Sequence, residues 1–409
     1  MNLKATITCL SVASLISAAA AGRSQTMERR PAHEAIGERF SHLLIRVATI
    51  ADSSQKDEAI RSYVSSAARF GHALIEDTTV YFLHYGKANR VSVPGDLNGW
   101  NPAADTMTRV QGTDLFYLAR GANLHIRFEY KLLVDSTWIL DPVNTQQTIG
   151  GYGPNSEVWM PGYAPPPEIL YRGGIPHGRI DTIAFRSRIL GRSHPVFVYT
   201  PPGYSRTRER YPLLILTDGG EYLTLALMQH VLDNLIADRR MAPIVAAFID
   251  PRTDIRDNNT SKRMTDYAMS DAFVTFLTGE LRPSLLKKYR ITKSPAQTGI
   301  MGASLGGLIA TYAAYQHPEV FGLCAAQSPS YWWNNEAIVS LVRDGPRKRV
   351  KFYIDSGTFG DAQENTRAMR SVLEQKGYLF HYAEYPEGHN WANWRSRIGG
   401  ILEFFWGTR

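Results

Sequence analysis

A glycine-flanked serine at residues 302–306 is the feature that most restricts how this chain can fold. Gly302, Ser304 and Gly306 follow an apolar segment, and apolar side chains recur at helical spacing over residues 308–313. This order of strand, turn and helix is typical of a nucleophile elbow, where a serine lies in a strained turn that larger neighbours would crowd. The helix would point N–H groups at a developing oxyanion. The alternative is a glycine-rich turn beside a buried serine.

A base and an acid suited to such a serine follow in the C-terminal part of the chain. His389 stands in the loop 386–391 after an aromatic, strand-like segment, and Asp361 stands in a glycine-rich loop past the end of a predicted strand. Asp355 is the alternative acid, although it lies nearer the strand and would only cap the turn. The order Ser304, Asp361, His389 is that of α/β-hydrolases and not that of either protease type.

These residues predict acyl transfer in two steps. His389 would take the proton of Ser304, and Asp361 would hold the imidazole in one tautomer. The expected oxyanion donors are the backbone N–H groups of Leu305, Gly219 and Gly220. The histidines show no metal-ligand spacing with nearby acids, so we predict no metal and no cofactor.

Four segments resemble a known family of esterases. They are residues 215–222, 302–307, 327–333 and 388–391. From about residue 183 to the end, the chain is similar to the family that includes enterochelin (ferric enterobactin), feruloyl and acetylxylan esterases. The third segment, Gln-Ser-Pro-Ser-Tyr-Trp-Trp, is most similar to the enterochelin esterases. The resemblance implies a hydrolase of carboxylic esters with an α/β-hydrolase fold.

Hydrophobic periodicity favours the same fold class. Residues 213–216 and 244–249 are continuous apolar runs, typical of strands that are buried on both faces. Helical stripes alternate with such runs up to the C-terminus. This alternation predicts a doubly wound, mostly parallel sheet.

The upstream part reads as a β-sandwich. Residues 79–132 alternate with a period of two between Gly, Asn and Asp turns. The segment 93–102, Val-Pro-Gly-Asp-Leu-Asn-Gly-Trp-Asn-Pro, resembles the turn of early-set sandwiches, which are similar to glycogen-binding modules. Trp100 and Trp138 would be core anchors, with a sugar-binding surface as the alternative. Our default expectation is a sandwich that only positions the esterase domain.

The domain boundaries follow from these patterns. We expect a signal peptide at 1–21, a helical segment at 28–75, the sandwich at 76–162, a linker at 163–178 and the hydrolase domain at 179–409. The first segment has the short apolar stretch and small residues of a secretory signal. We therefore expect export to the periplasm or beyond, with no membrane span in the mature chain.

The charge and the cysteine content limit the kinds of partner and nucleophile that we expect. The formal net charge is +7, but Lys and Arg are dispersed and not interleaved with stacking aromatics, so we expect no nucleic-acid partner. A mild positive field favours an anionic substrate. Cys324, the single cysteine outside the signal segment, is expected in a buried strand and not as a nucleophile.

Aromatic and basic residues near the predicted site are the candidate substrate ligands. They are Trp332, Trp333, Trp394, Arg263 and Arg395. The rings would stack on a planar ester and the guanidinium groups would meet negative charge. A catecholate siderophore satisfies both demands, and a feruloyl or acetyl ester of plant polysaccharide is the alternative. The aromatic residues could instead form a packed rim that binds no ligand. Two other functions also stay open: a carbohydrate-binding protein with an inactive hydrolase domain, and an acyltransferase.

Overall fold

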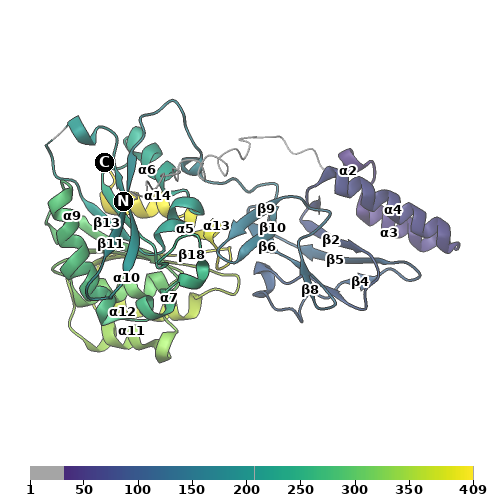
Figure 1. The fold of residues 1–409 in the computed structure, drawn as a ribbon. Helices are drawn as coiled ribbons and strands as arrows, with labels where there is room; N and C mark the ends of the chain where they lie inside the picture. Colours follow the sequence, from purple (N-terminus) through teal and green to yellow (C-terminus); the bar gives the residue numbers. More distant parts are fainter. Residues whose placement is uncertain (1–31, 207, 409) are drawn as a thin grey trace, which may run out of the picture.

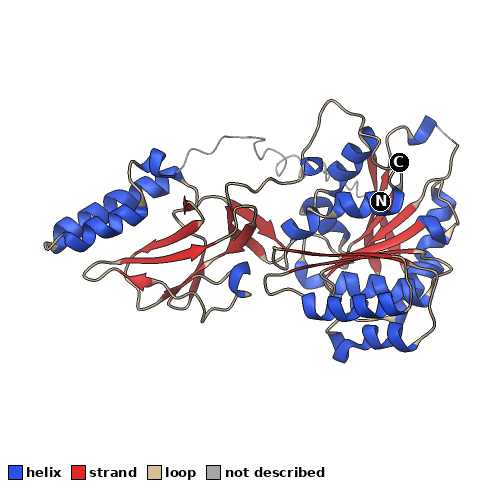
Figure 2. Cartoon of the chain, turned by 180° about the vertical axis from the view of Figure 1, so that it is seen from behind, coloured by secondary structure: helices blue, strands red, loops and turns tan. Residues whose placement is uncertain are grey.

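The computed structural model describes residues 32–206 and 208–408, and the expected signal peptide lies outside this part. Figure 1 shows three bodies in a row: a helical hairpin, a β-sandwich and an α/β domain. The reverse view in Figure 2 shows the same order, with the sandwich in the middle. None of the helices in the described part of the chain has the length and apolar character needed to cross a membrane.

The helical hairpin packs on the sandwich. It consists of α2 (Ala32–Ile36), α3 (Phe40–Thr49) and α4 (Ser53–Phe70). Asp52 caps the start of α4, and Gly71 ends the helix with a φ of 69°. Phe40 and Ile60 lie on the apolar faces of these helices and belong to one buried cluster with Leu83 of the sandwich.

Three small antiparallel sheets form the sandwich. Their strand orders are β1-β2-β5-β4, β6-β10-β9 and β3-β7-β8. The strands are β1 (Leu74–Glu76), β2 (Thr79–Tyr85), β3 (Val91–Ser92), β4 (Thr108–Arg109), β5 (Leu115–Gly121), β6 (Arg127–Tyr130), β7 (Leu132–Val134), β8 (Thr137–Ile139), β9 (Gln147–Gly150) and β10 (Gly153–Trp159). In β2, Phe82 points into the sandwich core and Leu83 points towards the helices, as a period of two requires.

The structure corrects one detail of the sandwich. Trp138 lies on β8 with 47% of its surface exposed, so the expectation that it anchors the core is wrong. Trp100 is half-buried, and its indole N–H donates to Asp96 at 3.0 Å. The β9–β10 pair lies beyond the strands that periodicity indicated.

The α/β domain is built on an eight-stranded sheet of order β11-β12-β14-β13-β15-β16-β17-β18. The strands are β11 (Arg179–Arg186), β12 (Ser193–Thr200), β13 (Leu213–Leu216), β14 (Val245–Ile249), β15 (Thr298–Ala303), β16 (Leu323–Gln327), β17 (Lys351–Gly357) and β18 (Phe380–Tyr385). β12 pairs antiparallel with β11 and β14. The remaining neighbours in the sheet, β14-β13-β15-β16-β17-β18, all pair in parallel. The sheet is therefore mostly parallel, as predicted.

Helices cover both faces of this sheet (Figure 2). One face packs against α7 (Arg263–Tyr267), α8 (Asp271–Thr275), the π-helical turn η5 (Phe276–Leu281), α9 (Arg282–Lys288), α10 (Leu305–Gln316), α11 (Trp333–Asp344) and α12 (Gln363–Gln375). The other packs against α5 (Gly219–Thr224), α6 (Met228–Ala237), α13 (Trp391–Arg395) and α14 (Ile398–Trp406). Cys324 is buried in β16, and burial raises the pKa of its thiol to about 12. The thiol therefore stays protonated at neutral pH.

The segment expected as a linker packs on the α/β domain. It contains the 3₁₀ turn η2 (Pro167–Ile169). The Asn234 side chain of α6 donates hydrogen bonds to the carbonyls of Glu168 and Leu170, both at 2.8 Å. These contacts fix the chain between the sandwich and the first strand of the large sheet.

Candidate active site

Ser304 lies at a sharp turn between β15 and α10. Its φ of 58° and ψ of −123° are strained for a residue with a side chain. A Cβ on Gly302 would overlap the Gly306 carbonyl and the Thr217 hydroxyl, so no larger residue fits there. The Ser304 amide donates to the Gln327 carbonyl at 2.9 Å. The elbow is therefore fixed by local sterics and by the neighbouring strand β16.

His389 and Asp361 form a hydrogen-bonded pair. Nδ1 of His389 lies 2.6 Å from Oδ1 of Asp361, and the carboxyl is buried while the imidazole is exposed. The Asp361 carboxyl also accepts hydrogen bonds from the Ser328 hydroxyl at 2.6 Å and from the Ala362 amide at 2.7 Å. Burial alone would raise its pKa, but these bonds and the His389 ring lower it below the ordinary value. The carboxylate therefore stays charged and leaves the other ring nitrogen of His389 for proton transfer.

Asp355, the alternative acid, has different surroundings. It is buried in β17, and one of its carboxyl oxygens has no hydrogen-bond partner within the described residues. Burial raises its pKa to about 7. The imidazole contacts Asp361, so the geometry favours Asp361 as the orienting acid.

The loop after β16 connects the serine to the acid. The hydroxyls of Ser304 and Ser330 lie 3.3 Å apart, and the Ser330 amide donates to the Ser304 carbonyl at 3.0 Å. Ser328, two residues earlier, contacts Asp361. Across residues 32–206 and 208–408 no hydrogen bond joins the Ser304 hydroxyl to His389. Sequence reasoning assigned no role to Ser328 and Ser330, although both stand in a segment that carried the family resemblance.

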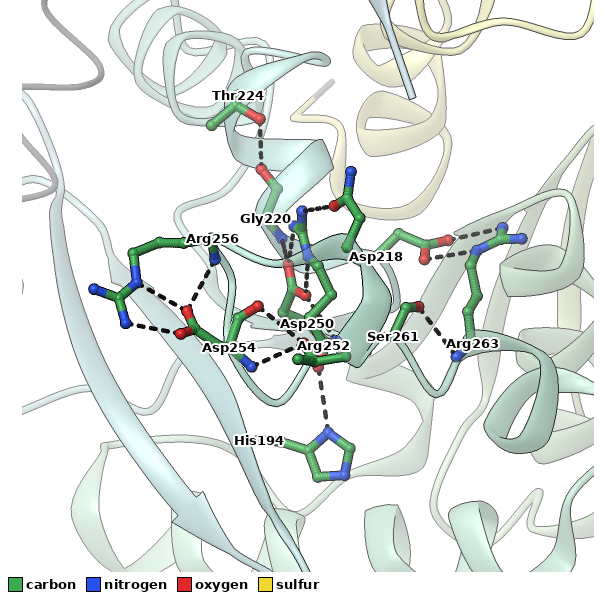
Figure 3. A network of polar contacts seen from close by, with 12 residues as sticks. His194, Asp218, Gly220, Thr224, Asp250, Arg252, Asp254, Arg256, Ser261 and Arg263 are labelled. Atoms are coloured by element: carbon green, nitrogen blue, oxygen red, sulfur yellow. Dashed lines mark hydrogen bonds and ion pairs between the residues drawn. The ribbon is translucent and has the colours of Figure 1, made fainter. Parts of the chain in front are cut away.

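The expected oxyanion donors differ in availability. The Gly220 amide donates to the Asp250 carboxylate at 3.0 Å, and this carboxylate also pairs with Arg252 (Figure 3). Gly220 is thus occupied and cannot serve as a donor without breaking that bond. Leu305 and Gly219 stand at the first positions of α10 and α5, where backbone N–H groups lack helical acceptors.

Arg263 is used within the protein. Its guanidinium group makes a two-point contact with the buried Asp218 carboxylate, with N–O distances of 2.8 and 3.0 Å (Figure 3). It also donates to the Ala303 carbonyl at 3.1 Å, directly before the serine. Because Asp218 already neutralises this cation, the expectation that Arg263 meets a substrate anion is not supported. The residue instead ties the turn after β13 to the elbow.

The comparison with known families shows to which protein family the chain belongs. A family model described as "Putative esterase" matches residues 187–405, more than half of the chain. The chain belongs to this family of carboxylic ester hydrolases.

Individual relatives carry more specific names. The esterase is 26% identical over 296 residues to the iron(III) enterobactin esterase of Dickeya dadantii, a match that covers 65% of this chain and 64% of that protein. It is 25% identical to the iron(III) salmochelin esterase of Escherichia coli, with 63% and 65% covered. The match therefore spans just under two thirds of each of these two relatives.

Solved structures show the same fold. The enterobactin esterase of Shigella flexneri, determined in the presence of enterobactin, superposes with a TM-score of 0.68 at 22% identity and covers 81% of this chain and 94% of that one. A ferulic acid esterase gives a TM-score of 0.50 at 20% identity and covers 56% and 98%. The larger share covered in the first comparison extends the likeness upstream of the α/β domain.

The aromatic candidates of the esterase divide into two kinds. Trp332 is 53% exposed and follows Ser330 by two residues, with the Trp333 ring 6.0 Å away. Trp394 is only 6% exposed, donates to the Ser328 hydroxyl at 3.0 Å and packs edge-on against the His389 ring. Trp394 thus supports the His389–Asp361 pair, contrary to the expectation that it stacks on substrate.

Arg395 lies on α13, on the α5 side of the sheet. Its guanidinium group donates to the Leu225 carbonyl at 3.5 Å and is partly exposed. With one long hydrogen bond and no carboxylate within ion-pair distance in the described chain, Arg395 keeps donors for a further partner.

Proposed function

We propose that this esterase is an exported serine hydrolase that cleaves ester bonds of a catecholate siderophore through an acyl-enzyme. The observation that supports it most is the short His389–Asp361 contact at the same sheet edge as the strained serine turn. An imidazole held by a buried carboxylate is the arrangement that activates a serine hydroxyl.

Acylation would proceed on groups of this chain alone. The free ring nitrogen of His389 takes the hydroxyl proton as Ser304 Oγ bonds to the ester carbonyl carbon. The resulting oxyanion accepts hydrogen bonds from the amides of Leu305 and Gly219. When the intermediate collapses, the carbon–oxygen bond to the alcohol breaks and the alcohol leaves with the proton from His389. Water then attacks the acyl group by the reverse sequence and frees Ser304.

The Ser304 hydroxyl starts this cycle beside Ser330 and not on His389. Hydrogen bonds between nucleophile and base are often long in free enzymes and tighten in the substrate complex. The hydroxyl therefore has to turn from Ser330 towards the imidazole when substrate enters.

Three observations favour a siderophore over a polysaccharide ester. The relatives from Dickeya dadantii and Escherichia coli are named for iron(III) enterobactin and salmochelin. Stacking on the exposed Trp332 ring does not separate the two, because a catechol ring and a feruloyl ring suit it equally. The net charge of +7 suits a ferric catecholate, which is an anion. The likeness to the ferulic acid esterase is confined to 56% of the chain. Export rests on the signal-like segment 1–21.

Hydrolysis assays on purified protein test this proposal. Wild type and Ser304→Ala are compared on ferric enterobactin, iron-free enterobactin, feruloylated arabinoxylan and short nitrophenyl esters. We expect wild type to cleave the enterobactin esters fastest and Ser304→Ala to cleave none of the substrates. Equal rates for the two proteins would overturn the serine mechanism, and a preference for arabinoxylan would replace the siderophore with a plant polysaccharide.

A further inference from the structure

One turn of the sandwich contacts the catalytic part of the α/β domain. This turn contains the 3₁₀ segment η1 (Asp96–Asn98) and lies within the segment that resembles glycogen-binding modules. In Figure 1, α13 lies beside β6, β9 and β10. The loop of His389 leads directly into α13 and therefore lies next to the sandwich. The Asn390 side chain donates to Asp96 Oδ2 at 2.9 Å across this boundary.

Asp96 is built into the turn as a fixed acceptor. It is 1% exposed, and it also accepts from the Glu129 amide at 2.8 Å and the Trp100 indole at 3.0 Å. On the other side of the histidine, a Cβ at Gly388 would overlap the Asp96 carboxylate. The two chain neighbours of His389 are therefore both packed against this one side chain.

Arg127 of β6 provides a second contact with the same loop. Its side chain is fully buried and donates to Asn390 Oδ1 at 3.0 Å. Glu129 and Glu157 of the sandwich hold the guanidinium at 2.8 and 2.7 Å, and Glu387 of the loop lies 3.7 Å away. With Asp96 and Arg127 in place, both polar atoms of the Asn390 side chain are bound by the sandwich.

The loop that carries Asp361 is held by the same surface. Phe359 packs against the sandwich core. Gly360 has a φ of 60°, and a Cβ there would lie 2.7 Å from the Cα of Gly99, which follows η1. One turn of the sandwich thus contacts the loops of both the base and the acid.

Buried charges at this boundary are costly. Burial, with the charge of Glu129 adding to it, raises the pKa of Asp96 to about 7. Paired buried charges contribute little net stability, because desolvation offsets their attraction. Their directional hydrogen bonds restrict the geometry of the groups that they join. Here the charged groups converge on residues 387–390.

We propose that the sandwich is a positioning part of the catalytic site, in which Asp96 and Arg127 hold the loop of His389 through Asn390. The inference rests on the proposed serine mechanism and goes beyond it. Asp96 Oδ2 accepts from the Glu129 amide and from Asn390, and Oδ1 accepts from the Trp100 indole, so this buried carboxylate is held within the protein and is not presented to a sugar.

A double-mutant cycle on kcat tests the proposal. Asp96→Ala, Asn390→Ala and the double variant are assayed on a short nitrophenyl ester, which is too small to need the sandwich for binding. Displacing the imidazole by about 1 Å should lower kcat on the order of 10- to 100-fold in each single variant, with KM little changed. Asn390→Ala also removes the contact with Arg127 and the cap of α13. Because both variants lose the Asp96–Asn390 bond, the loss in the double variant should still be smaller than the product of the two single losses.

Tyr85→Phe is the matched control. The Tyr85 hydroxyl at the end of β2 donates to the Asp57 carboxylate of α4 at 2.7 Å, a bond between the sandwich and the helical hairpin. It should lower the melting temperature and leave kcat unchanged. If Asp96→Ala does not fold, Asn390→Asp provides the test, since it keeps an acceptor for Arg127 but sets two carboxylates against each other.

The outcomes separate the two proposals. An inactive wild type would remove the serine mechanism itself. An active wild type whose Asp96→Ala or Asn390→Asp variant keeps full kcat would overturn the positioning role. Multiplying losses in the double variant would overturn it as well, because independent effects share no contact.

Discussion

The two halves of the catalytic site are held in different ways. The serine half is local: a turn at Ser304 is enforced by two glycines and by strands of the same sheet. The histidine half depends on distant residues, since Asn390 is bound by Asp96 and Arg127, 294 and 263 positions away in the chain. A change in the sandwich should therefore reach the base and leave the nucleophile in place.

The largest effect should come from the serine half. Ser304→Ala removes the attacking oxygen, so kcat on a nitrophenyl ester should fall on the order of 10⁵-fold or more. The melting temperature should not fall, because alanine is no larger than serine and, among the described residues, the hydroxyl makes one long hydrogen bond, to Ser330. Activity within tenfold of wild type would mean that another group attacks the ester.

The next effect tests the acid of the histidine half. Asp361→Asn keeps the shape of the side chain but favours the wrong tautomer of His389, so kcat should fall about 10⁴-fold. Asp355→Asn is the matched control and should lower kcat far less, because Asp355 does not contact the imidazole. A reversed ranking of the two variants would assign the acid to Asp355.

A smaller effect tests the link between the two halves. Ser328→Ala removes a hydrogen bond to the Asp361 carboxylate and leaves the Trp394 indole without its acceptor. A hydrogen bond to a charged group is worth about 1.5–3 kcal/mol, so kcat should fall on the order of 10-fold. Ser396→Ala serves as control, since its hydroxyl contacts the Ala392 carbonyl and Tyr163 and not Asp361. Equal kcat in Ser328→Ala and wild type would remove Ser328 from the site.

The last prediction concerns the pH dependence of stability and not kcat. The pKa of Asp355 is raised to about 7 by burial, above its ordinary value of 3.8, so the folded state binds a proton that the unfolded state releases. Its contribution to the free energy of unfolding is full below about pH 4 and is lost as pH rises towards 7. Asp355→Asn should flatten this part of the pH dependence in urea titrations. A stability that rises with pH by the same amount in both proteins would contradict the raised pKa.

The sequence predicted the features that arise from local patterns, and it did not predict the side-chain contacts between distant segments. The turn at Ser304 and the mostly parallel sheet follow from spacing and periodicity, because strand and helix patterns repeat over short windows. Loop position and chain order also predicted Asp361 and His389 as the candidate acid and base. It misjudged Arg263 and Trp394, since spacing does not tell whether a loop side chain points to solvent or to a buried carboxylate or hydroxyl.

The contact between the sandwich and the α/β domain could not be predicted from the sequence. Asp96 stood in a turn that resembles sugar-binding modules, and nothing in its neighbourhood points to Asn390. A pair of residues from separate domains leaves no periodic signal in one sequence. Only the packing of the two bodies reveals that this turn faces the loop of His389.

Covalent labelling of Ser304 tests the proposed mechanism most directly. Wild type and His389→Ala are treated with a fluorophosphonate, and the modified peptide is identified by mass spectrometry. We predict one adduct per wild-type chain, on Ser304, and a strongly slowed reaction in His389→Ala. An unlabelled wild type, or an adduct on another residue, would contradict a serine activated by His389.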